Sequence, residues 1–167
     1  MQAQEITAAL VHEVKHRLFV ESLPRIRSCL NKLRDEQIWW RPNEASNSIG
    51  NLLLHLNGNV RQWILTGLGD QPDDRKRQTE FDERNPIPKD KLWNTLDETM
   101  RELTPVLDAV TPEDLLKKRP VQTFEETGMS ILVHVTEHFS YHTGQIAWIT
   151  KMLISEDLGF YKDIKLE

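Results

Sequence analysis

The sequence lacks the features that mark several large classes of protein. It contains one cysteine, Cys29, among 167 residues, and a single thiol can form neither an internal disulfide nor a cysteine-based zinc site. No stretch approaches the roughly 18 continuous apolar residues of a membrane-spanning helix. The first ten residues lack the basic start and apolar centre of a secretory signal. We therefore expect a cytoplasmic protein without a membrane partner.

The chain also carries fewer positive than negative charges. The chain has 21 Lys and Arg against 26 Asp and Glu, which gives a net charge of −5. Proteins that bind nucleic acid usually carry a basic stripe, so we expect no nucleic-acid partner. Seven Gly and eight Pro exclude a collagen-like or low-complexity chain. The length suits one domain, residues 1–167.

Helical periodicity dominates what is present. Apolar side chains recur at the spacing of an amphipathic helix in four segments, residues 5–33, 49–68, 89–110 and 130–154. With no competing strand pattern, this predicts an all-α four-helix bundle. Pro24 is expected to kink or divide the first helix. We also expect a short helix capped by Thr111 and an extended segment, residues 119–126, before the last long helix.

The polar segment 70–88 connects the second and third predicted helices and is long for a loop in a compact domain. At about 3.3 Å per residue, such a segment can span a whole helix. The second and third helices could therefore run parallel, with the segment as a crossover. Its run of charges, residues 73–77, is most simply interpreted as solvated.

The histidines of the last helix are the most informative residues. His138 and His142 fall within its apolar face, and His134 lies further out on the same side. Side chains at i and i+4 are roughly 5–6 Å apart at Cβ, so both buried histidines could reach one ion at about 2.1 Å. They could also be core residues held by hydrogen bonds. A shared metal ion would satisfy both imidazoles at once.

A third ligand is needed for a good site. His55 is the natural candidate, because it lies midway along the second helix at the flank of its apolar face. Three histidines leave a position open for water or substrate, which is typical of catalytic rather than structural sites. Gln145 and Asn59, at i+3 from His142 and i+4 from His55, are expected to contact the ligands or a substrate.

Other candidates carry less weight. His12, Glu13 and His16 match the H-E-x-x-H pattern of zinc metalloproteases, but three fixed letters often match by chance. The pair also lies off the apolar face, which favours solvated or boundary histidines. Tyr141 and Glu137 are weak candidates for proton transfer, because they point partly or almost wholly away from the histidines.

Two segments resemble a known family. WWRPNEASNSIGNLLLHLNGNVRQWI and EHFSYHTGQI, residues 39–64 and 137–146, are similar to the DinB-like (damage-inducible) superfamily of bacterial proteins. The resemblance extends from the first helix to about Leu153. It implies a bundle with a long crossover between helices two and three, frequent homodimers, and a divalent metal, usually zinc or nickel, on His55, His138 and His142. Characterised members include transferases and isomerases that use low-molecular-weight thiols such as bacillithiol or mycothiol.

We therefore expect a divalent-metal-binding protein, and favour a metal-dependent transferase that activates a low-molecular-weight thiol. A bound metal lowers the pKa of a thiol, and no carboxylate base is evident near the three histidines. The alternatives are a metal-dependent hydrolase, a non-catalytic metal-binding stress or sensor protein, and a bundle with core histidines and no metal. A homodimer is expected from the resemblance and from Gly144, which lies opposite the histidines and would permit close approach.

Overall fold

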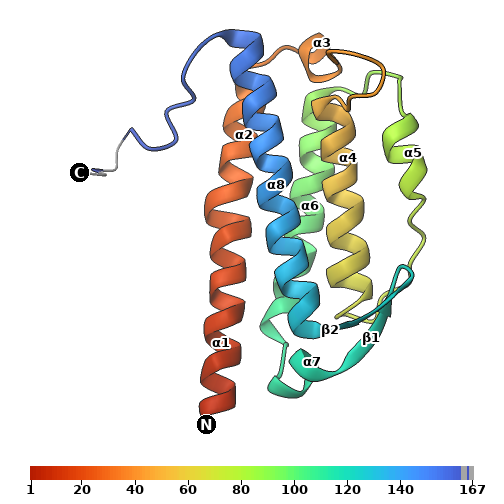
Figure 1. Ribbon diagram of the computed structural model, residues 1–167, viewed down its shortest axis with the longest axis vertical. Helices are drawn as coiled ribbons and strands as arrows, with labels where there is room; N and C mark the ends of the chain where they lie inside the picture. Colours follow the sequence, from red (N-terminus) through yellow and green to blue (C-terminus); the bar gives the residue numbers. More distant parts are fainter. Residues whose placement is uncertain (163–164, 166–167) are drawn as a thin grey trace.

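Four long helical segments lie side by side and form the body of the molecule (Figure 1). The computed structural model describes residues 1–162 and residue 165. In chain order the segments are α1 (Gln2–Lys15) with the π-helical η1 (His16–Ser22) and α2 (Leu23–Asn31), then α4 (Ile49–Val60) with the π-helical η2 (Arg61–Thr66), then α6 (Lys89–Asp108), and finally α8 (Gly128–Ile154). The predicted helical bundle is confirmed.

Pro24 does not end the first helical segment. It lies in the first turn of α2, directly after the π-helical η1. Proline removes one backbone donor and crowds the preceding turn, and in this chain the preceding turn is the wider π-helical one. The expected division is therefore a local change of helix type, and the chain continues in the same direction (Figure 1).

Helix α4 begins at a reciprocal cap. The Ser48 hydroxyl accepts a hydrogen bond from the Asn51 backbone N–H, and Asn51 Oδ1 accepts one from the Ser48 backbone N–H, both at 3.2 Å. This arrangement satisfies donors that the first turn of a helix leaves unpaired. The cap also fixes the Asn51 side chain, whose Nδ2 donates to the carbonyl oxygens of Glu80 at 2.9 Å and Glu83 at 3.1 Å.

The segment after η2 is a crossover, as predicted. It returns along the outside of α4, so that α4 and α6 run in the same direction (Figure 1). A short helix, α5 (Arg77–Asp82), interrupts it and packs against α4. Near its end, Trp39 Nε1 donates to the carbonyl oxygen of Ile87 at 3.0 Å. The crossover is therefore attached to the bundle at both Asn51 and Trp39.

The remaining elements close the ends of the bundle. Helix α3 (Asp35–Ile38) lies between the first and second long segments, and α7 (Pro112–Leu116) starts at Thr111, whose hydroxyl accepts from the Asp114 backbone N–H at 3.2 Å. The predicted extended segment is an antiparallel hairpin, β1 (Lys118–Val121) and β2 (Phe124–Thr127), with Lys118 opposite Thr127.

One apolar core runs between the four long segments. The largest side chains in it that are wholly buried include Leu18, Ile26, Leu30, Leu53, Leu56, Ile64, Leu96 and Phe139. Burying each aliphatic or phenyl group of this size contributes roughly 1.5–3 kcal/mol. Among the described residues, no helix combines the length and apolar character needed to cross a membrane.

Candidate metal centre

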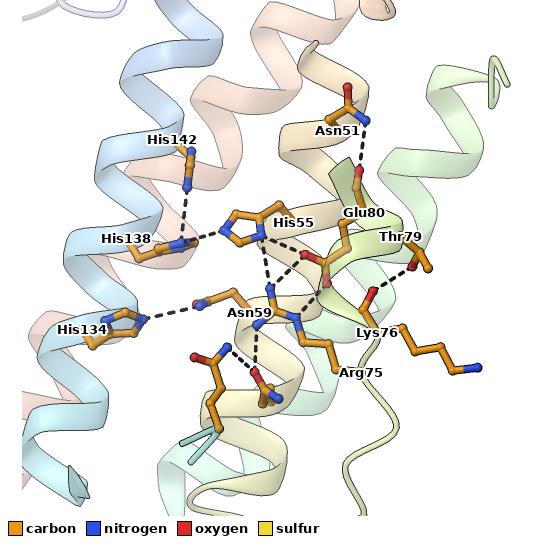
Figure 2. A network of polar contacts seen from close by, with 12 residues as sticks. Asn51, His55, Asn59, Arg75, Lys76, Thr79, Glu80, His134, His138 and His142 are labelled. Carbon is orange, nitrogen blue, oxygen red and sulfur yellow. Dashed lines mark hydrogen bonds and ion pairs between the residues drawn. The ribbon is translucent and has the colours of Figure 1, made fainter. Parts of the chain in front are cut away.

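Three histidines from two helices converge beside this core. His55 comes from α4, and His138 and His142 come from neighbouring turns of α8 (Figure 2). His138 Nε2 lies 3.0 Å from His55 Nε2 and 3.2 Å from His142 Nε2. The ligand atoms of all three lie within 4.8 Å of one another, and no other group of His, Cys, Asp or Glu in the described part of the chain could share a metal ion in this way.

Hydrogen bonds on the far side of two rings determine where their protons lie. His55 Nδ1 is 2.8 Å from a carboxylate oxygen of Glu80, and His142 Nδ1 is 2.7 Å from Gln145 Oε1. Both partners are acceptors, so each Nδ1 donates. A neutral imidazole carries one proton, so the Nε2 atoms of His55 and His142 present lone pairs to the centre.

Burial keeps the two candidate ligands of α8 neutral. It lowers the pKa of His138 to about 3, with further lowering by the nearby His142 and His55. Burial also lowers the pKa of His142, against an opposing hydrogen bond to Gln145. His138 Nδ1 is buried without a partner among the described residues. Neutral imidazoles whose Nε2 atoms face one point are the donor set that zinc and nickel accept, so the cluster could hold a metal ion.

A buried carboxylate supports His55 from the crossover. Arg75 donates from Nε to Glu80 Oε1 at 2.7 Å and from Nη2 to Glu80 Oε2 at 2.9 Å. The two side chains are only 5% and 10% exposed. Burial raises the pKa of Glu80, but the hydrogen bonds from Arg75 and His55 outweigh it, and the net pKa is lowered. Glu80 is therefore ionised at neutral pH.

Two expectations about the crossover need correction. The charge run was interpreted as solvated, and four of its five residues are exposed, but the Arg75 side chain is buried against Glu80. No carboxylate base was evident near the three histidines in the sequence, and Glu80 of the crossover touches His55. Both corrections have the same cause, because the position of a crossover against α4 depends on tertiary packing. Gly58 on α4 is the feature of the sequence that could have indicated this packing. A Cβ added there would lie 2.1 Å from Glu80 Oε1, so the crossover can approach only a glycine.

Further amides extend the polar contacts away from His55. Gln62 Oε1 accepts from Arg75 Nη1 at 2.9 Å and from Gln122 Nε2 at 2.6 Å. Gln62 Nε2 in turn donates to Asp73 Oδ2 at 2.7 Å. Because Gln122 lies in the turn of the hairpin, a continuous chain of polar contacts joins the hairpin to His55.

His134 lies one turn below His138 on α8, outside the group of three. Its ring stacks on Trp63 with centroids 3.7 Å apart, and its Nε2 is 3.4 Å from Asn59 Nδ2 (Figure 2). Asn59 therefore contacts His134, whereas Gln145 touches His142 as expected. Within the part of the chain that the structure describes, Asn59 Oδ1 and Trp63 Nε1 are buried without partners.

The weaker candidates lie away from the three Nε2 atoms. Tyr141 is 62% exposed and meets His142 edge-on. Glu137 is exposed and lines the groove between α8 and η1. His12 and His16 line a separate groove of about 530 Å³ between the first helical segment and α6, and among the described residues no third ligand joins them.

Two solved structures share this fold. A DinB-like protein from Bacillus cereus ATCC 10987 matches with a TM-score of 0.62 at 15% identity, over 81% of this chain and 87% of that one. A conserved protein from Enterococcus faecalis matches with a TM-score of 0.66 at 14% identity, over 92% and 98%. At such identities the likeness shows the fold alone, and it confirms the DinB-like fold.

Sequence comparison is less specific about activity. A family model described as "Protein of unknown function (DUF1572)" matches residues 5–162. No curated protein is similar enough in sequence to count as a match.

Proposed function

Because the chain belongs to the DUF1572 family, whose description assigns no activity, we propose a function from the site itself. We propose that His55, His138 and His142 bind one divalent ion, zinc or nickel, through Nε2, and that the loaded protein is a transferase that activates a low-molecular-weight thiol. The observation that carries the proposal is the convergence of the three Nε2 atoms, with separations of 3.0 Å and 3.2 Å along the row.

The charges around the site favour an anionic substrate group. Burial lowers the pKa values of His138 and His142, which are therefore neutral, and the negative charge of Glu80 is balanced by Arg75. A bound divalent ion supplies Lewis acidity and lowers the pKa of a thiol or water beside it. The protein leaves that ion's positive charge uncompensated, so a thiolate or hydroxide is the ligand that the surroundings stabilise best.

The lack of a free base near the three histidines favours a thiol over water as the group that loses its proton there. Within the described residues no unpaired carboxylate faces the three Nε2 atoms, since both oxygens of Glu80 are engaged and Glu137 lies on another side of α8. A thiol has an ordinary pKa of about 8.5 and water one of about 15.7. A thiol therefore needs much less help to ionise, which supports thiol transfer over hydrolysis.

Metal analysis tests the site. We expect near-stoichiometric zinc or nickel by elemental mass spectrometry in protein purified without chelator, and loss of the metal in each of His55→Ala, His138→Ala and His142→Ala. His134→Ala is the matched control, because it removes a histidine from the same row and should keep the metal. No binding after addition of zinc or nickel, or equal loss in His134→Ala, would refute the proposed site.

Spectroscopy then tests the thiol. Addition of cysteine to nickel-loaded protein should produce a sulfur-to-nickel charge-transfer absorption, whereas serine should produce none. A spectrum unchanged by cysteine, together with hydrolysis of activated esters that depends on the metal, would favour the hydrolase. Tight metal binding with neither response would favour a non-catalytic metal-binding stress or sensor protein.

A further inference from the structure

We propose that Glu80 is a positioning residue, which holds His55 with its proton on Nδ1 and so turns the Nε2 lone pair toward His138 and His142. Arg75 holds the Glu80 carboxylate in the orientation that this requires. Where it concerns metal affinity, the inference rests on the proposed function. Where it concerns the proton on His55, it can be tested in metal-free protein.

The hydrogen-bond geometry allows one assignment of that proton. Glu80 Oε2 receives Arg75 Nη2 at 2.9 Å and lies 2.8 Å from His55 Nδ1. An ionised carboxylate can only accept, so the hydrogen in the second contact belongs to His55. Arg75 Nη2 also lies 3.1 Å from His55 Nδ1, but an Nδ1 that already bears a proton cannot accept from it.

The Glu80 carboxylate cannot easily turn away. Arg75 binds both of its oxygens through two donors, and a bidentate pair of this kind fixes orientation as well as distance. The backbone of the same residue is also held, because Asn51 Nδ2 donates to the Glu80 carbonyl oxygen at 2.9 Å. Asn51 thus holds the backbone of Glu80 and Arg75 holds its carboxylate, independently of His55.

One face of the second helical segment is built to receive the crossover. Asn51, His55, Gly58 and Gln62 recur at the spacing of one helical face, and each meets the crossover. Asn51 binds two of its carbonyl oxygens, His55 binds Glu80, Gly58 leaves room for the Glu80 carboxylate, and Gln62 accepts from Arg75. The position of Glu80 is therefore set by this whole face.

Glu80 makes His55 unlike the other two histidines. Among residues 1–162 and 165, the Nδ1 of His142 meets only a neutral amide, Gln145, and the Nδ1 of His138 has no partner. A charged acceptor on the far nitrogen fixes the tautomer and makes the facing nitrogen a better donor to metal. Among the three, His55 should therefore contribute most to affinity through its supporting residue.

The test is Glu80→Gln, with Glu83→Gln as the matched control. The new amide group offers one carbonyl oxygen where the carboxylate offered two, and Arg75 brings two donors to it against one from His55. We expect Arg75 to keep that oxygen, so that the amide N–H faces His55 and the proton moves to Nε2. Glu83 lies in the same crossover, but its carboxylate accepts from Asn85 and the Arg84 backbone, not from a histidine. The first readout is ¹⁵N NMR of the imidazole nitrogens in metal-free protein. The second is Zn²⁺ affinity, measured against a competing chelator.

We expect Nδ1 of His55 to be protonated in the wild type and in Glu83→Gln, and Nε2 to be protonated in Glu80→Gln. Zinc affinity should fall about 10–100-fold in Glu80→Gln and stay unchanged in Glu83→Gln. If the unpaired Arg75 prevents Glu80→Gln from folding, Arg75→Met combined with Glu80→Leu removes both the stranded charge and every acceptor for His55 Nδ1, and should show the same loss of affinity and of the Nδ1–H tautomer.

The outcomes separate the two proposals. A wild-type His55 protonated on Nε2, or a Glu80→Gln protein with unchanged tautomer and affinity, would overturn the role of Glu80 even if the three histidines bind zinc. Conversely, if the proton moves as expected but the wild type binds neither zinc nor nickel, the positioning role stands and the proposed function fails.

Discussion

His55 Nδ1 lies 2.8 Å from the carboxylate of Glu80, a residue 25 positions further along the chain. The contact joins the inner face of α4 to a crossover that runs along the outside of the bundle (Figure 2). It therefore connects a buried candidate ligand to a segment whose composition is that of a polar loop. The consequences of this connection can be measured in several ways.

Gly58→Ala should weaken metal binding without touching a histidine. The added Cβ would lie 2.1 Å from Glu80 Oε1 and 2.8 Å from Arg75 Nε, so the ion pair must move away from His55. We expect zinc affinity to fall about tenfold or more, measured by chelator competition.

Gly144→Ala provides the control for that substitution. Apart from the neighbouring backbone of its own helix, no atom of the described residues lies within 4 Å of a Cβ added there, and alanine is favoured over glycine inside a helix by up to about 1 kcal/mol. We expect unchanged zinc affinity and higher stability to denaturant. If sedimentation instead shows that a larger assembly dissociates, Gly144 lies in the homodimer contact expected from the sequence.

Metal removal should lower the thermal stability of the wild type. Zinc at a hundred times its Kd stabilises a folded protein by about 2.7 kcal/mol. For a chain of this length that corresponds to an increase in Tm of about 5–10 °C, measured by calorimetry before and after chelation. His55→Ala should show no such dependence. A Tm in the wild type that does not respond to zinc would contradict specific binding to the folded state.

Substitutions of the two hydroxyl caps should distinguish an effect on stability alone from an effect on metal binding. Thr111→Ala removes the cap of α7, and Ser48→Ala removes the cap of α4, each at a cost of about 1 kcal/mol in the free energy of unfolding. Ser48 also orients Asn51, which holds the crossover. We therefore expect Ser48→Ala alone to weaken zinc binding as well. Equal effects of the two substitutions on affinity would mean that Asn51 is oriented by other contacts.

Cys29 should resist alkylation over a wide pH range. Burial raises the pKa of its thiol, with partial relief from a hydrogen bond to Thr150. A raised pKa reduces the thiolate fraction at any given pH, and only the thiolate reacts. The usual pKa of a cysteine is about 8.5. Labelling of Cys29 by iodoacetamide should remain slow even above that pH and become fast in denaturant. Rapid labelling of the folded protein would show that this part of the core opens.

Much of the bundle follows from local spacing in the sequence. The apolar repeats locate the four long helices, Thr111 starts α7 as predicted, and the length of the 70–88 segment indicates the crossover. His138 and His142 are neighbours for the same reason, since residues four apart on one helix face the same way. These features depend on the chain within a few residues of each position.

Tertiary structure decided what surrounds the histidines. Nothing near Arg75 or Glu80 in sequence distinguishes them from the other charges of the crossover, and their burial arises because that segment packs on Asn51, Gly58 and Gln62 of the second helical segment. His134 likewise follows the spacing of its neighbours but stacks on Trp63 instead of joining them. Helical periodicity thus determined which side chains could meet, while the path of the crossover, set by packing between distant residues, decided which charges lie beside them.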